Sequence, residues 1–155
     1  MQRIAVKLVM GIAITAIGML GADSSIGTWK FNAAKSKSTS TNPLKSRTDI
    51  YEATSDGGIK LTRTEQRADG TKNNISYSCK YDGKPCPVTG GPYDSISVKR
   101  VDPSTTTFEV TKTGGKYHIT GKRVISKDGK TMIWNSKGTD GAGKAVESTY
   151  VLDKQ

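Results

Sequence analysis

Apolar and polar residues alternate in short runs along most of the chain, starting at about residue 26. In residues 26–32, Trp29 and Phe31 share one face of an extended chain and Thr28 and Lys30 share the other, which predicts a strand. No 11-residue window offers a convincing helical stripe. The further predicted strands are residues 48–54, 59–66, 73–81, 84–88, 95–101, 105–113, 116–126, 131–139 and 144–152.

Turn signals separate these strands at regular intervals. They are Asp56-Gly57-Gly58, Asp69-Gly70, Asp82-Gly83, Asp102-Pro103-Ser104, Gly114-Gly115, Asp128-Gly129 and Asp140-Gly141. Asp-Gly favours tight hairpins, so neighbouring strands should be antiparallel. A meander of this length avoids exposed edges most simply by closing on itself. We therefore predict an all-β fold, a single up-and-down antiparallel barrel of about 8–10 strands.

Residues 33–47 form the longest stretch without strand character. They are rich in Ser, Thr, Asn and Pro, and they carry Lys35, Lys37, Lys45 and Arg47 without an acid. In a barrel this segment would be the loop over one mouth, either a lid or a mobile loop with no role.

The N-terminal 22 residues have the features of a secretory signal peptide. Arg3 and Lys7 precede an uncharged apolar run, and the small residues Gly21 and Ala22 follow it. The alternative is an uncleaved anchor, but the run is short against the ~20 residues that span a bilayer. We expect cleavage near Ala22, a barrel domain over residues 23–155 without a transmembrane span, and export to the periplasm or medium.

The composition of residues 23–155 favours a partly hollow barrel. Only 37 of these residues, about 28%, are hydrophobic, which is few for a solid core. A loosely ordered protein would fit this composition as well. The net charge of this part is +8, which indicates either a soluble surface or attraction to an anionic ligand or surface. Because the protein is predicted to be exported, we do not expect it to bind nucleic acid.

Several runs resemble the lipocalin and fatty-acid-binding-protein superfamily, in particular exported bacterial lipocalin-like proteins. They are Gly27-Thr28-Trp29-Lys30-Phe31-Asn32, Tyr81-Asp82-Gly83-Lys84, Ser126-Lys127-Asp128-Gly129-Lys130-Thr131-Met132 and the terminal strand that ends at Gln155. The resemblance implies a hollow barrel that binds a small, largely apolar molecule. Intracellular fatty-acid binders hold a carboxylate with an Arg-x-Tyr pair on the last strand, whereas Ser148 precedes Tyr150 at that spacing here.

Strand parity predicts which side chains face the interior. Arg63, Arg100 and Arg123 fall in phase with apolar residues, and inward-facing cations need an anionic partner such as a ligand or Glu65. Alternatively, Arg63 and Arg100 lie near strand ends and reach solvent, or a bulge reverses the parity. The predicted ligand-binding residues are Arg63, Tyr77, Arg100, Tyr117, Arg123, Trp134 and Tyr150. Gly27 and Trp29 are predicted to form the structural floor of the barrel.

Cys79 and Cys86 lie directly opposite each other if a two-residue turn is centred on Asp82-Gly83. In an exported protein this favours a structural disulfide over a redox site, because the spacing is not Cys-x-x-Cys.

Catalytic and metal-binding patterns are weak in this sequence. His118 is the sole histidine, it falls out of phase with Tyr117 and Ile119, and it is predicted to face water. No nucleophile elbow is present, although a carboxylate pair among Glu52, Glu65, Glu109 and Glu147 stays open.

We therefore expect non-catalytic binding of a small apolar or amphiphilic molecule, with an anionic amphiphile as the sharper hypothesis, by a monomer without cofactor or metal. The alternative is an envelope protein that docks through its basic outer surface, with its barrel filled by side chains. A small barrel enzyme is a third, weaker interpretation.

Overall fold

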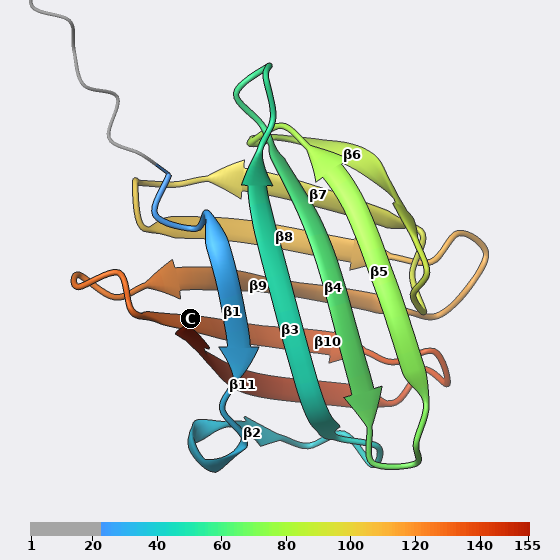
Figure 1. Ribbon diagram of the computed structural model, residues 1–155. Helices are drawn as coiled ribbons and strands as arrows, with labels where there is room; N and C mark the ends of the chain where they lie inside the picture. Colours follow the sequence, from blue (N-terminus) through green and yellow to red (C-terminus); the bar gives the residue numbers. More distant parts are fainter. Residues whose placement is uncertain (1–22) are drawn as a thin grey trace, which may run out of the picture.

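Residues 23–155 are described by a computed structural model, in which ten strands close into one antiparallel barrel (Figure 1). The barrel strands are β1 (Gly27–Phe31), β3 (Leu44–Ala53), β4 (Ile59–Arg67), β5 (Lys72–Cys79), β6 (Asp82–Thr89), β7 (Ser95–Arg100), β8 (Thr105–Thr111), β9 (His118–Ile125), β10 (Thr131–Thr139) and β11 (Ala145–Lys154). The predicted up-and-down barrel is confirmed. The predicted signal peptide, residues 1–22, lies outside the described part.

The barrel closes where its first and last strands meet. β1 pairs with β3 on one side and with β11 on the other, and Trp29 lies opposite Lys154 in this seam. Every other barrel strand pairs with its neighbours in the sequence, as expected for strands joined by hairpin turns. Figure 1 shows β3, β4 and β5 crossing the view steeply, while β8 to β11 run behind them at a large angle.

The segment between β1 and β3 differs from its prediction at the C-terminal end. It contains a 3₁₀ turn, η1 (Ala33–Lys35), and a two-residue strand, β2 (Lys37–Ser38), which pairs with β11. β3 begins at Leu44, so the prediction of a loop through Arg47 is wrong for the last four residues. Within residues 23–155 no helix has the length and apolar content needed to cross a membrane.

One end of the barrel is closed around Trp29. This side chain is fully buried, and its Nε1–H donates to the Ser25 carbonyl oxygen at 2.8 Å. Gly27 precedes it with a φ of +124°, a conformation that side chains with a Cβ rarely adopt. The backbone conformation is therefore what requires glycine here.

Residues 23–25 complete this closed end. The Asp23 carboxylate accepts hydrogen bonds from the hydroxyls of Ser25, at 2.6 Å, and Tyr81, at 2.7 Å. It also forms an ion pair with Arg100, whose guanidinium lies 3.8 Å from the centre of the Tyr81 ring. These contacts tie the residues before β1 to β7 and to the β5–β6 turn.

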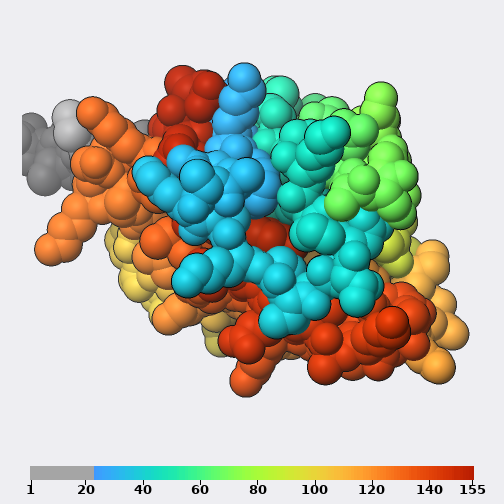
Figure 2. Space-filling view, turned by 90° about the horizontal axis from the view of Figure 1, so that it is seen from below, coloured from blue at the N-terminus to red at the C-terminus, as the bar shows by residue number. Residues whose placement is uncertain are grey.

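The opposite end is the mouth, which the segment between β1 and β3 crosses (Figure 2). We call residues 36–43 the mouth segment. On one side, the Ser38 hydroxyl lies 2.8 Å from that of Ser148, and the Glu147 amide donates to the Thr39 hydroxyl at 2.9 Å. On the other side, the Asn42 carbonyl oxygen accepts from Arg67 at 3.1 Å. The mouth segment thus spans from β11 to β4.

A disulfide joins Cys79 at the end of β5 to Cys86 in β6, with a Cα–Cα distance of 5.7 Å. The register of these strands, in which Ser76 lies opposite Thr89 and Tyr77 opposite Val88, places the two cysteines opposite each other as predicted. The predicted disulfide is therefore present.

Candidate functional site

A row of charged side chains crosses the interior from β3 to β4. Residues two apart on a strand point to the same side, so Arg47 and Asp49 both face inward from β3. On β4, Arg63 lies opposite Asp49 and Glu65 lies opposite Arg47. The pairing of two strands therefore brings two guanidinium groups and two carboxylates together inside the barrel.

Asp49 is shared by two guanidinium groups. Its Oδ1 accepts from Nε of Arg47 at 2.9 Å and from Nε of Arg63 at 2.7 Å. Its Oδ2 accepts from Nη2 of Arg47 at 2.5 Å and from Nη2 of Arg63 at 3.0 Å. Each arginine thus makes a two-pronged contact, the arrangement that holds a carboxylate most firmly. All three side chains are buried, and Asp49 is fully inaccessible to solvent.

The buried charges do not balance within the described residues. Arg47, Arg63 and Arg123 are buried cations, whereas Asp49 and Glu65 are the buried acids. Burial by itself would raise the pKa of Asp49, but Arg47 and Arg63 outweigh burial and hold this pKa well below its usual value near 3.8. Asp49 is therefore an anion at neutral pH, and the interior keeps an excess of positive charge.

Trp134 on β10 provides an aromatic surface for these cations. The guanidinium carbons of Arg47, Arg63 and Arg123 lie 4.5, 5.1 and 5.7 Å from a ring centre of its indole. Cations within about 6 Å of an aromatic ring are attracted to its face. The indole in turn contacts Phe108, with ring centres 4.7 Å apart. Trp134 therefore links the charged row to the opposite wall.

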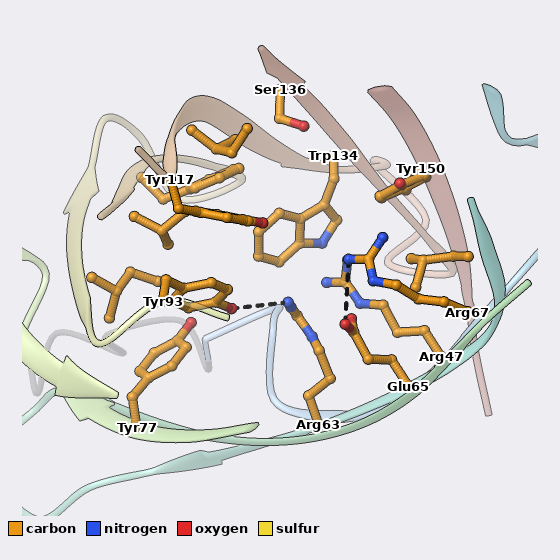
Figure 3. A pocket seen from close by; sticks show the side chains of 15 residues that line it. Arg47, Arg63, Glu65, Arg67, Tyr77, Tyr93, Tyr117, Trp134, Ser136 and Tyr150 are labelled. Atoms are coloured by element: carbon orange, nitrogen blue, oxygen red, sulfur yellow. Dashed lines mark hydrogen bonds and ion pairs between the residues drawn. The ribbon is translucent and has the colours of Figure 1, made fainter. Parts of the chain in front are cut away.

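A cavity of about 80 Å³, the inner cavity, lies between the charged row and Trp134 (Figure 3). Its charged lining is Arg47, Arg63, Arg67 and Glu65. Its aromatic lining is Tyr77, Tyr93, Phe108, Tyr117, Trp134 and Tyr150. Leu44, Ile96, Val110 and Ile119 supply aliphatic contacts. The barrel is thus partly hollow, and the lining combines positive charge with aromatic surface.

A wider hollow of about 420 Å³, the vestibule, lies beneath the mouth segment. Arg67, Tyr117, Ile119, Ser136 and Tyr150 line both the vestibule and the inner cavity. Ser40, Thr41 and Asn42 of the mouth segment form part of its rim. These shared walls make the vestibule the natural approach to the inner cavity.

Arg67 and Glu65 stand where the two spaces meet. Arg67 contacts Glu65 at 3.4 Å, and the amide of Asn73 donates to the same Glu65 oxygen at 2.9 Å. Arg67 also holds the Asn42 carbonyl oxygen. Its side chain is 22% exposed, which makes it more accessible than Arg47 and Arg63, the other two arginines that line the inner cavity.

Five of the seven predicted ligand-binding residues line the inner cavity. They are Arg63, Tyr77, Tyr117, Trp134 and Tyr150. Arg123 is buried in the barrel beside Tyr51 but does not line this cavity. Arg100 is placed elsewhere, because its position at the closed end leaves it paired with Asp23. A binding role for these residues stays a prediction.

The sequence reasoning missed Arg47, Asp49, Arg67 and Tyr93. Arg47, Asp49 and Tyr51 are two residues apart and so share one face of an extended chain, but the predicted strand begins at Thr48 and leaves Arg47 outside it. Arg67 continues the phase of Arg63 and Glu65. Tyr93 precedes β7 and lies outside any predicted strand, so the alternation of side chains along a strand does not show whether it points inward.

His118 lies on the exposed side of β9, with its Nε2 atom 2.7 Å from Oε1 of Glu109. Neither residue lines the inner cavity. In the part of the chain that the structure describes, no group of three or more His, Cys, Asp or Glu side chains could hold a metal ion.

Comparisons with known proteins bear on the fold. No protein-family model and no curated protein matches this chain. The solved structure of EF1p2_mFAP2b bound to DFHBI aligns with a TM-score of 0.52 at 14% identity, covering 86% of this chain and 96% of that one. This likeness supports the barrel fold.

Two further structures align less closely. A redesigned beta barrel, mFAP1, bound to DFHBI, gives a TM-score of 0.45 at 14% identity, covering 84% of this chain and 95% of that one. A mutant of the fluorescent protein UnaG gives 0.48 at 10% identity, covering 83% and 95%.

Proposed function

We propose that this protein binds a small anionic amphiphile inside its barrel without catalysing a reaction on it. The observation that carries the proposal is the inner cavity, where Arg47, Arg63 and Arg67 face aromatic side chains and only Glu65 opposes them on the wall. A buried excess of cations is costly unless an anion enters, so the cavity is suited to a negatively charged group. The aromatic lining is suited to the apolar part of such a molecule.

Displacement of an anionic fluorescent probe, 1-anilinonaphthalene-8-sulfonate, tests this function. The probe should brighten on binding the purified barrel, and small anionic amphiphiles should displace it while uncharged analogues of the same size should not. Arg67→Gln should weaken probe binding about threefold or more, because it removes the cation that lines both the inner cavity and the vestibule.

Arg100→Gln is the matched control, because Arg100 lies at the closed end away from the cavity. It should leave probe affinity unchanged. The proposal is wrong if the probe fails to bind, or if both variants weaken it equally.

Export to the periplasm or medium belongs to the same proposal, together with the likeness to exported bacterial lipocalin-like proteins. The Cys79–Cys86 disulfide supports it, because disulfides persist in oxidising compartments. N-terminal sequencing of the protein from its own host should find a start near Asp23. Recovery of the intact chain from the cytosol would contradict export.

Docking through the basic outer surface remains the alternative from a different class. Several outer lysines are already matched by acids, such as Lys60 with Glu52 and Lys112 with Asp94, which weakens the case for it. Salt separates the two functions: surface docking should weaken steeply as ionic strength rises, whereas binding in the buried cavity should change little.

A further inference from the structure

Arg47 and Arg63, the two arginines bound to Asp49, each keep N–H donors that the carboxylate does not use. Arg47 and Arg63 both use Nε and Nη2 on the carboxylate. The remaining nitrogen of Arg63, Nη1, lies 3.5 Å from the Tyr93 hydroxyl, a distance at the outer limit of a hydrogen bond. Asp49 therefore fixes the orientation of Arg63 while leaving its Nη1 group directed at the cavity.

Two tyrosine hydroxyls in the same lining lack protein partners. Across residues 23–155, neither Tyr77 nor Tyr117 has a side-chain hydrogen bond, although Tyr77 is only 5% exposed. Figure 3 shows both side chains directed into the cavity, as is Tyr93. Burial raises the pKa of Tyr77 and of Tyr117, so both hydroxyls stay protonated and can donate. Both side chains line the cavity, so their hydroxyls are free to donate to an oxyanion bound there.

The volume of the inner cavity limits what can reach these donors. About 80 Å³ holds about five to eight water molecules, at about 10–15 Å³ of such space for each. A carboxylate with the edge of one ring fits this space, whereas an extended alkyl chain does not. The rest of any ligand must lie in the vestibule, whose 420 Å³ is reached past Tyr117 and Tyr150.

The walls through which the ligand would pass are aromatic. Tyr117 packs on Tyr93 with ring centres 5.5 Å apart, and Tyr150 packs on Phe31 at 5.6 Å. Tyr117 and Tyr150 line both spaces, so a ring that extends from one space into the other would contact both side chains.

Resting on the proposed function, we infer that the ligand is an aromatic carboxylate that enters carboxylate first. Its carboxylate accepts from Arg63 Nη1 and from the hydroxyls of Tyr77 and Tyr117, and its ring system lies between Tyr117 and Tyr150. Three donors, of which only Arg63 Nη1 has a protein acceptor, the distant Tyr93 hydroxyl, favour a compact oxyanion over a hydroxyl group. The aromatic walls and the small inner cavity favour a ring over a long chain.

Calorimetric titration with three compounds tests the ligand class. They are 2-naphthoate, the uncharged 2-naphthylmethanol with the same rings, and palmitate with the same charge on a long chain. We expect 2-naphthoate to bind at least tenfold more tightly than either of the others. Tighter binding of palmitate overturns this inference and leaves the proposed function standing. Equal binding of the alcohol overturns the inward carboxylate, and failure of every anion, including the fluorescent probe, overturns both.

Tyr77→Phe and Tyr117→Phe test the donors themselves. Each substitution keeps the ring and removes a hydroxyl that bonds to no protein group, so the melting temperature without ligand should not fall. Affinity for 2-naphthoate should drop about tenfold or more, because a hydrogen bond to a charged group is lost.

Tyr81→Phe is the control, since its hydroxyl bonds to Asp23 at the closed end. It should lower the melting temperature and leave 2-naphthoate affinity unchanged. Wild-type affinity in both Tyr77→Phe and Tyr117→Phe would show that the carboxylate binds elsewhere.

Discussion

Asp49 is the carboxylate that offsets the cost of burying Arg47 and Arg63. It is fully buried and accepts four hydrogen bonds from Arg47 and Arg63. Replacing a whole buried ion cluster with apolar side chains can leave the free energy of unfolding unchanged. Removing one partner lowers it, because the remaining charges stay buried without a counter-ion. Asp49 is therefore needed for stability even though it does not line the cavity.

Asp49→Asn should destabilise the barrel by about 3–5 kcal/mol, because two guanidinium groups lose their counter-ion. Thermal unfolding should show a melting temperature lowered by roughly 10 °C or more. Glu52→Gln removes an exposed carboxylate paired with Lys60 and should change the melting temperature little. A melting temperature for Asp49→Asn within a degree or two of wild type would mean that the arginines are not held by this carboxylate.

Acid should reveal the same residue through the pH dependence of stability. Burial opposes ionisation of Asp49, yet Arg47 and Arg63 hold its pKa below 3.8 in the folded state. A lowered folded pKa means that the contribution is present above pH 3.8 and is lost as the pH falls below that value. Urea midpoints measured from pH 5 to 2 should fall more steeply for wild type than for Asp49→Asn. Parallel curves would contradict the assignment.

The β5–β6 hairpin depends on its disulfide more than the other hairpins depend on any single bond. These strands share only the register pairs Ser76–Thr89 and Tyr77–Val88 over the described residues, whereas β4 and β5 are paired along their length. Cys79–Cys86 closes the hairpin beyond the point where the ladder ends.

The double variant Cys79→Ala, Cys86→Ala should lose about 2–3 kcal/mol, the chain-entropy estimate for so short a loop. Amides of residues 76–89 should exchange faster with deuterium than those of β9 and β10, which have a continuous ladder. Chemically reduced wild-type protein should match the variant. If protection over residues 76–89 is unchanged in both, the hairpin does not rely on the disulfide.

The sequence predicted the strands well wherever apolar residues occupy the inward positions. Ile59 and Leu61 on β4, or Ile96 and Val98 on β7, give an alternation that needs no further knowledge. The start of β3 could not be found in this way, since its inward positions hold Arg47 and Asp49, and the register shifts between Leu44 and Ser46. A strand that faces a polar interior lacks the usual pattern.

The sequence predicted those site residues whose inward direction follows from the alternation of side chains along a strand. Arg63, Tyr77 and Trp134 lie on long regular strands, so their inward direction follows from the alternation. Arg100 follows the same alternation, but it is the last residue of β7. Its side chain therefore extends past the end of the strand to Asp23 instead of into the interior. The partnership of Arg47, Asp49 and Arg63 depends on the register of two strands, which a single sequence does not determine.

At the scale of the whole molecule, the mouth segment connects opposite walls and forms part of the rim of the vestibule. The Asn42 side chain accepts from the Asp69 amide at 3.2 Å, which anchors the segment to the β4–β5 turn. Ser38 and Thr39 anchor it to β11. The segment at the rim of the vestibule is therefore held by a few hydrogen bonds to the walls on either side.

Asn42→Ala should speed both entry and release of the anionic probe, since it frees one anchor of the mouth segment. Because the bound state is unaltered, the equilibrium affinity should change little. Stopped-flow fluorescence measures both rates. Thr41→Ala alters the same segment without removing a side-chain hydrogen bond and should leave the rates near wild type. A change in affinity alone would place Asn42 in the binding site instead of at its entrance.

The seam between β1 and β11 also has a consequence for how the protein folds. Trp29 and Lys154 are neighbours in the barrel but are joined by almost the whole described chain. Until β11 pairs with it, β1 has an unpaired edge and the charged interior lies open to water. Contacts between such distant residues form slowly, over milliseconds to seconds. We therefore expect barrel closure to be a late event of folding, and the enclosed cavity to exist only once β11 has paired with β1.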